Sequence, residues 1–189
     1  MRKLKLQIQI SVDGFIAGPN GEMDWMVWDW DDELKQFTQE LTDSFDCIVL
    51  GRKLAEGFIP YWKTVADDPA NPEQEAGKKF TDTQKVVFTK TLDKSNWDNT
   101  VLAKGDLNEE IGKLKNQDGK DIIVYGGATF VSSLLKNSMI DELNFFVNPT
   151  LNGNGMTIFG DIRERQNLKL INCKAYSCGI SVMTYSLNR

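Results

Sequence analysis

One stretch decides how this chain folds: Asp121-Ile-Ile-Val-Tyr-Gly-Gly-Ala-Thr-Phe-Val-Ser-Ser-Leu-Leu135. Its first part is a short apolar run, from Ile122 to Tyr125, that predicts a buried strand. Two glycines follow, and the residues after them have the spacing of an amphipathic helix. Such a junction brings bare backbone and free helix N–H groups to one point, where a phosphate can bind.

A second junction of the same kind lies upstream, at Cys47-Ile-Val-Leu-Gly-Arg-Lys53. Here the expected strand ends at Gly51, and the expected helix opens with two cations, Arg52 and Lys53. Arginine can bind a phosphate through two parallel hydrogen bonds, although a solvated first turn is the plainer interpretation of this segment alone. Two such junctions in one chain predict a nucleotide cofactor along the carboxyl ends of parallel strands.

Length and composition predict a single domain spanning residues 1–189. The chain has 189 residues, of which 41% are apolar and 26% charged, as is typical of globular proteins. No apolar run approaches the ~20 residues of a membrane span, and the first ten residues alternate like a strand instead of forming a signal-peptide core. We therefore expect a cytoplasmic protein with no membrane partner. The net charge of −5 argues against a nucleic-acid partner, but it allows local binding of an anionic cofactor.

The chain contains no histidine, which excludes several enzyme classes. Histidine general bases, Ser-His-Asp and Cys-His pairs, and zinc deaminases all depend on that residue. The cysteines, Cys47, Cys173 and Cys178, lack Cys-x-x-Cys spacing, so neither a disulfide nor a metal site is expected. Acid–base chemistry therefore falls to carboxylates, lysine, tyrosine or ordered water.

Strands and helices alternate along most of the chain. Strands are expected at 3–12, 46–50, 85–89, 100–103, 122–125 and 140–147. Helices are expected at 31–42, starting over Gly51 to Phe58, at 107–114 and after Gly127, and the polar segment 64–82 predicts a loop plus a surface helix. Two alternating segments, 168–176 and 180–187, predict a terminal hairpin. The order predicts an α/β fold: a mixed, mostly parallel sheet with helices on both faces and a C-terminal antiparallel hairpin.

A long segment, residues 13–30, separates the first strand from the first helix. Loops of this length are usually functional, and this one carries Trp25, Trp28 and Trp30. Their rings could stack on a flat substrate. They could equally cover the first helix, and the sequence leaves both interpretations open.

In their order along the chain, these motifs resemble the dihydrofolate reductase superfamily, and more closely the branch that contains the reductase domain of the bifunctional riboflavin-biosynthesis protein. The resemblance is carried by Ser11-Val-Asp-Gly-Phe-Ile-Ala-Gly18, Val49-Leu-Gly-Arg-Lys53, Val86-Val-Phe-Thr-Lys-Thr-Leu92, Val124-Tyr-Gly-Gly-Ala-Thr-Phe130, Ile140-Asp-Glu-Leu143 and Leu151-Asn-Gly-Asn-Gly-Met-Thr-Ile-Phe159. It covers nearly the whole chain and implies a dihydrofolate-reductase-like fold. Because the first expected strand starts at Lys3, we do not expect a counterpart of the deaminase-like domain of the bifunctional protein in this sequence.

The resemblance implies NADPH-dependent reduction of a pterin-like or aminopyrimidine-type small molecule, or of its opened ribityl precursor. The residues that match the family's cofactor contacts are Gly51, Arg52, Lys53, Thr89, Lys90 and Thr91 for the adenosine end, Gly126, Gly127, Ala128 and Thr129 for the pyrophosphate, and Ile16 and Ala17 for the nicotinamide. The loop after Ala17 matches a mobile lid. The resemblance also suggests a cis bond between Gly126 and Gly127.

Hydride transfer also requires a proton, which folate reductases obtain with help from a carboxylate at the start of the first helix. Aligning Leu34 and Phe37 with the apolar pair of that helix makes Glu33 the first choice, with its side chain expected in the cleft. Acids in a first turn are also favoured simply by the helix dipole. Asp24 is the second choice among the nearby carboxylates, and Asp31 and Asp32 are rivals. The expected substrate contacts are Trp25, Trp28 and Phe37, although the segment 25–30 departs from the folate reductases and makes folate a doubtful substrate.

Two further expectations concern assembly and activity. The terminal hairpin offers an alternating strand edge, which suits a homodimer, as in the riboflavin-reductase branch. The alternative function is a non-catalytic NADP-binding protein of the same fold. Loss of NADPH absorbance with a candidate substrate separates the two functions.

Overall fold

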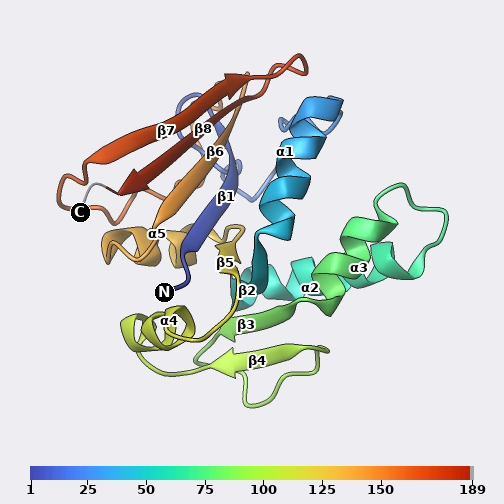
Figure 1. Ribbon diagram of the computed structural model, residues 1–189. Coiled ribbons are helices and arrows are strands. Elements are labelled where there is room, and N and C mark those ends of the chain that lie inside the picture. Colours follow the sequence, from blue (N-terminus) through green and yellow to red (C-terminus); the bar gives the residue numbers. More distant parts are fainter. Residues whose placement is uncertain (188–189) are drawn as a thin grey trace.

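The computed structural model describes residues 1–187, which form an eight-stranded sheet with helices on both faces (Figure 1). The strands are β1 (Leu4–Ser11), β2 (Phe45–Gly51), β3 (Gln84–Phe88), β4 (Thr100–Ala103), β5 (Asp121–Val124), β6 (Glu142–Asn148), β7 (Leu168–Ala175) and β8 (Ser181–Leu187). The helices are α1 (Asp32–Asp43), α2 (Arg52–Asp67), α3 (Gln74–Asp82), α4 (Leu107–Lys115) and α5 (Ala128–Lys136).

The strands lie side by side in the order β4-β3-β2-β5-β1-β6-β8-β7. Neighbouring strands from β4 to β6 are parallel, whereas β8 runs antiparallel to both β6 and β7. The predicted mixed, mostly parallel sheet with a C-terminal antiparallel hairpin is therefore confirmed.

Side-chain patterning explains the two packed faces. β2 and β5 are apolar at consecutive positions, because each is covered on both sides. On one face, Ile111 of α4 and Val131 of α5 pack against Leu4, Leu6 and other residues of the sheet. On the other face, α1, α2 and α3 cover a second core and part of a third (Figure 1).

The segment 64–82 is more helical than predicted. α2 continues to Asp67 with Pro60 inside it, and α3 follows with Phe80 buried in the core. A proline inside a helix lacks the N–H donor of its turn, so its presence hides a continuing helix from pattern-based prediction. Gly77 lets α3 approach α2 closely, since a Cβ there would lie 2.7 Å from the backbone nitrogen of Ala66.

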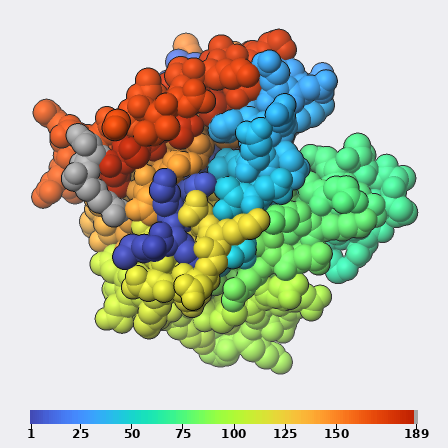
Figure 2. Space-filling view, in the orientation of Figure 1, coloured from blue at the N-terminus to red at the C-terminus, as the bar shows by residue number. Residues whose placement is uncertain are grey.

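The parallel strands all end at one edge of the sheet, which we call the carboxyl edge. α2 and α5 begin there, directly after β2 and soon after β5. The turn between β7 and β8 reaches the same edge, because Ser181 pairs with Val147 near the end of β6. The hairpin and α1 form a continuous surface in the space-filling view (Figure 2). Within residues 1–187, no helix combines the length and apolar character needed to cross a membrane.

Candidate functional site

Two helices begin on glycine at neighbouring strand ends of the carboxyl edge. Gly51 ends β2 and caps α2, and Gly127 caps α5 after β5. β2 and β5 pair directly, and a Cβ on Gly51 would lie only 2.9 Å from Cβ of Phe130 in α5. The two helix starts therefore pack against each other, and the absent side chain of Gly51 permits that approach.

The starts of α2 and α5 differ in charge from those of α1 and α4. Asp31 and Asp106 accept hydrogen bonds from the first-turn amides of α1 and α4, and both helices have further acids in the first turn. α2 and α5 have neither a side-chain cap nor an acid in the first turn. Free amides and the positive end of the helix dipole attract an anion. The paired starts of α2 and α5 therefore form a candidate anion site.

Gly126 and Gly127 turn the chain from β5 into α5 with positive φ angles. Their φ values are 149° and 84°, and ψ of Gly127 is 97°. Residues with a side chain rarely adopt the conformation of Gly127, even though a Cβ there would meet Phe130 and Leu54 only at ordinary distances of 3.7 and 3.8 Å. The predicted cis bond is wrong, because every peptide bond within the described residues is trans and the two positive φ angles already make the turn.

The expected adenosine contacts lie at the ends of β2 and β3, which pair so that Gly51 is opposite Phe88. The guanidinium of Arg52 lies 2.6 Å from Glu56 one turn along α2, and Lys53 is exposed beside it. The hydroxyl of Thr89 is buried and accepts the amides of Thr91 and Leu92, both at 3.1 Å. That hydroxyl therefore shapes the turn after β3.

The same turn displays Lys90 and Thr91 to solvent. Because β3 lies beside β2, Lys90 emerges at the same edge as the cations that open α2. The structure thus brings the three predicted cations, Arg52, Lys53 and Lys90, to adjoining strand ends.

The segment predicted to flank the nicotinamide is joined to the loop after β6. The amide of Ile16 donates a hydrogen bond to the carbonyl of Met156 at 2.8 Å, and the amide of Met156 donates one to the carbonyl of Ala17 at 2.9 Å. The carboxylate of Asp13 accepts the amides of Asn152 and Gly153 at 3.1 and 2.7 Å. Together with the Ser11 hydroxyl, which is the main cause, these amides lower the pKa of Asp13 to about 2.

Residues 24–30, here called the tryptophan loop, contact the end of β6. The amide of Val27 donates to Oδ1 of Asn148 at 2.8 Å, and the carbonyl of Val27 accepts Nε1 of Trp30 at 2.7 Å. Trp30 packs on Phe146 with ring centroids 5.9 Å apart and stacks on Trp28 at 6.4 Å. Trp28 is 62% exposed. The loop therefore holds an aromatic face open to solvent.

The other two predicted substrate contacts lie in different environments. Trp25 is half-buried, and its Nε1 donates to the carbonyl of Glu22 at 3.2 Å. Phe37 packs on Phe146 at 6.0 Å, in the core beneath α1. Trp28 is thus the most exposed of the three predicted contacts.

The prediction that Glu33 points into the cleft is wrong. Its side chain is 69% exposed, and its carboxylate lies 3.1 Å from Nζ of Lys174 on β7. The register of α1 directs Leu34 into the core and turns Glu33 toward the hairpin, where Lys174 attracts it. This contact raises the pKa of Lys174.

The carboxylates near Glu33 differ in whether hydrogen bonds hold them in place. Both oxygens of Asp31 are used: Oδ1 accepts the amide of Leu34, and Oδ2 accepts the Ser177 hydroxyl and the Cys178 amide. The Leu34 amide, followed by Ser177, lowers the pKa of Asp31 to about 2. Asp31 therefore ties the start of α1 to the hairpin turn, while Asp24 is exposed in the tryptophan loop.

Comparison with known proteins places the chain in a family. The family model for the RibD C-terminal domain matches residues 2–182. This chain belongs to that family. Two proteins of Bacillus subtilis (strain 168) are similar to this RibD C-terminal domain protein and are described as uncharacterized. YyaP is 32% identical over 187 residues, which are 99% of this chain and 96% of YyaP, and YwjB is 26% identical over 181 residues, 96% of both.

Solved structures share the dihydrofolate-reductase-like fold. A putative riboflavin biosynthesis protein from Shewanella sp. PV-4 has a TM-score of 0.75 at 23% identity, with 100% of both chains covered. A bifunctional deaminase and 5-amino-6-(5-phosphoribosylamino)uracil reductase from Thermotoga maritima has a TM-score of 0.69 at 19% identity, covering 98% of this chain and 56% of that one. The riboflavin biosynthesis reductase Rib7 of Saccharomyces cerevisiae has a TM-score of 0.61 at 16% identity, covering 98% and 90%.

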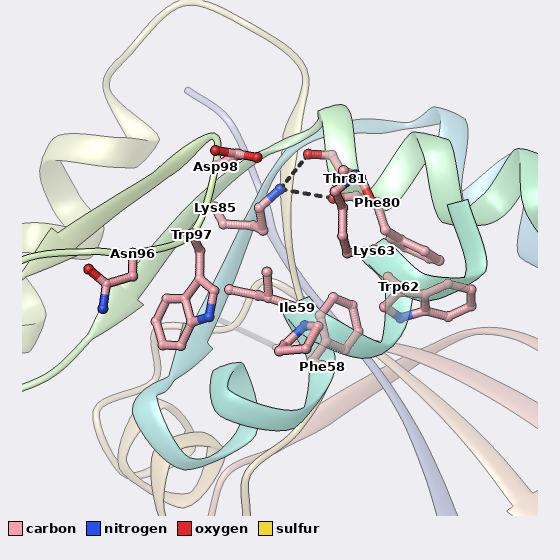
Figure 3. A pocket seen from close by; sticks show the side chains of 11 residues that line it. Phe58, Ile59, Trp62, Lys63, Phe80, Thr81, Lys85, Asn96, Trp97 and Asp98 are labelled. Carbon is pink, nitrogen blue, oxygen red and sulfur yellow. Dashed lines mark hydrogen bonds between the residues drawn. The ribbon is translucent and has the colours of Figure 1, made fainter. Parts of the chain in front are cut away.

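A cavity of about 240 Å³ lies elsewhere in this RibD C-terminal domain protein, at the amino end of β3. Phe58 and Trp62 of α2 line it with Trp97, as Figure 3 shows. The buried ammonium of Lys85 donates to the carbonyls of Phe80, Thr81 and Thr83 at 2.7–3.0 Å, so it caps α3. Burial lowers the pKa of Lys85. The ammonium of Lys85 beside this cavity already has three acceptors, and the carboxyl edge remains the candidate site.

Sequence reasoning missed the two polar residues that organise the loops, Asp13 and Asn148. Asp13 belongs to an Asp-Gly turn, which marks a turn but does not identify the partner loop. Asn148 ends an apolar strand and is fully buried. A polar residue in a buried strand was the one available signal, because such a group needs a specific partner.

Proposed function

We propose that this protein is an NADPH-dependent reductase of a pterin-like or aminopyrimidine-type small molecule, such as 5-amino-6-(5-phosphoribosylamino)uracil. The observation that carries the proposal is the pair of uncapped helix starts at Gly51 and Gly127, with three cations beside them. Family membership supports it, as do the reductases among the proteins of similar fold.

The residues at the carboxyl edge fit the cofactor. The backbone at Gly126 and Gly127 leaves space that a Cβ would enter, and the amides that begin α5 suit the pyrophosphate. Arg52, Lys53 and Lys90 suit the additional phosphate of NADPH. When bound, NADPH supplies a hydride from its nicotinamide ring.

The chain's own residues then bind the nicotinamide, orient the substrate and supply the proton. Ile16 and Ala17 are fixed by their bridge to Met156, so they provide a firm wall for the nicotinamide. The ring of Trp28 can stack on a planar substrate. Because Glu33 pairs with Lys174 and Asp31 is committed to the hairpin, we assign the proton to Asp24 or to an ordered water.

Arg52 gives the sharpest test of the cofactor. Arg52→Ala should raise the dissociation constant of NADPH roughly tenfold, because a charge-assisted bond is worth ~1.5–3 kcal/mol at best, and should leave that of NADH nearly unchanged. Glu56→Gln frees the guanidinium and should tighten NADPH binding a few-fold. Lys63→Ala is the matched control, since Lys63 makes a similar pair with Asp67 at 2.7 Å on the same helix. Equal weakening of both cofactors by Arg52→Ala would remove the phosphate assignment.

The position of Glu33 also favours a second candidate, a non-catalytic NADP-binding protein of the same fold. Because Glu33 forms an ion pair with Lys174 of the hairpin, its carboxylate is not placed to transfer a proton in the cleft. This candidate predicts a thermal shift with NADPH but no loss of NADPH absorbance when 5-amino-6-(5-phosphoribosylamino)uracil is added. Oxidation of NADPH in that assay would exclude it.

A further inference from the structure

We propose that Asn148 is a positioning residue that holds the tryptophan loop on the carboxyl edge and so presents the ring of Trp28 to the substrate. The proposal rests on the proposed reductase function. Its basis is a fully buried amide at the end of β6 that accepts a hydrogen bond from a loop outside the sheet.

The orientation of the Asn148 amide is set by its two donor contacts. Nδ2 donates to Oε1 of Gln9 at 2.9 Å and to the carbonyl of Phe146 at 3.1 Å. These contacts leave Oδ1 directed at the amide of Val27, 2.8 Å away. Buried polar groups are nearly always paired, so without this acceptor the Val27 amide would have to donate its hydrogen bond to water.

Val27 is linked to the exposed ring of Trp28 through Trp30. The Val27 carbonyl holds the indole N–H of Trp30, and Trp30 rests on Phe146, two residues before Asn148 on the same strand. Trp28 stacks on Trp30 with an interplanar angle of 20°. Strand β6 thus holds the loop by one hydrogen bond and one ring contact. Trp28 is supported from beneath while its outer face stays open for a planar ring.

Asn144 provides a comparison on the same face of the same strand. It is 1% exposed, and its amide contacts the Leu6 carbonyl at 3.2 Å and the Thr184 hydroxyl at 2.9 Å, both within the sheet. Asn144 and Asn148 therefore have similar burial and chemistry. Only Asn148 reaches the tryptophan loop with its oxygen.

Hydrogen exchange of the loop tests the proposal without depending on catalysis. In Asn148→Ala, peptides covering residues 24–30 should exchange roughly tenfold faster, the effect of losing one hydrogen bond. In Asn144→Ala, the same peptides should exchange as in the parent, whereas β1 and β8 become less protected. Unchanged loop exchange in Asn148→Ala, or equal acceleration in both variants, would overturn the proposal.

Val27→Pro gives a second route if Asn148→Ala does not fold. It removes the donor from a loop residue and leaves the sheet intact, and it should accelerate loop exchange to a similar extent. Unchanged exchange would again overturn the proposal. With NADPH and 5-amino-6-(5-phosphoribosylamino)uracil, either variant should raise the substrate KM roughly tenfold and leave NADPH affinity unchanged. If the parent protein does not oxidise NADPH, only the reductase function is contradicted. The exchange result then still decides whether Asn148 holds the loop.

Discussion

A single backbone position, Gly127, gives the strictest residue-scale test of the anion site. Its φ of 84° and ψ of 97° would strain any side chain by about 1–3 kcal/mol. Gly127→Ala should therefore raise the NADPH dissociation constant tenfold or more while the fold survives. Gly112→Ala is the control, because a Cβ there meets nothing within 4 Å. Titration of NADPH fluorescence measures both, and near-parental affinity in Gly127→Ala would contradict the pyrophosphate assignment.

Asp31 makes stability depend on acid pH. Its pKa is about 2 in the folded protein and about 3.9 in an unfolded chain, so its contribution is complete above pH ~4 and is lost as the pH falls toward 2. Asp31→Asn keeps the acceptor for Leu34 but loses the one for Ser177. The melting temperature of Asp31→Asn should be lower than the parent's at pH 7, and this difference should disappear as the pH falls from 4 to 2. Asp32→Asn, at a fully exposed neighbour that lies 4.0 Å from Lys35, should lower the melting temperature much less.

Residue roles could be predicted only where they depend on local sequence. The glycines and cations at the strand ends were identifiable because a strand–glycine–helix junction is visible in the local sequence pattern. The partner of Glu33 was not, since Lys174 is brought to it by the hairpin from a distant part of the chain. Asn148 was missed for the same reason: its partner Val27 lies in a loop whose path the sequence does not show.

Between elements, the packing of α2 on α3 depends on one glycine. A Cβ on Gly77 would lie 2.7 Å from the backbone of Ala66 and 2.9 Å from Val65, so Gly77→Ala should destabilise the protein by about 1–3 kcal/mol. Gly57→Ala, in α2 with open space around its Cβ, should stabilise it by about 0.5–1 kcal/mol. Urea unfolding compares the two. Equal stability of both variants would contradict the close approach.

Whole elements were predictable where burial imposes a period. β1 shows its alternation because one face packs on α4 and α5, and the consecutive apolar residues of β2 and β5 report burial on both faces. The continuation of α2 was hidden by Pro60. α3 was hard to place because its sequence is largely polar, with only Gly77 and Phe80 buried.

For the molecule as a whole, the two edges of the sheet differ in what they expose. β4 has four residues, whereas β7 has eight, all of them exposed. On β7, Leu168, Leu170 and Ile171 are 41%, 53% and 56% exposed. A long edge strand with apolar side chains tends to pair with another chain. The order of strands and helices made the sheet predictable, but which edge stays open follows only from the assembled structure.

We predict that β7 joins two copies of the chain in a homodimer. A two-fold interface brings the same surface of both copies into contact, so pairing along β7 would shield its exposed apolar side chains in each copy. Light scattering at micromolar concentration should give twice the chain mass of 21.4 kDa. Ile171→Glu should return the mass to that of one chain, because it brings two like charges into an apolar contact. Val101→Glu, at a residue of similar exposure on the β4 edge, should leave the dimer intact. A parental mass near 21.4 kDa would exclude a stable dimer and leave the apolar side chains of β7 facing water.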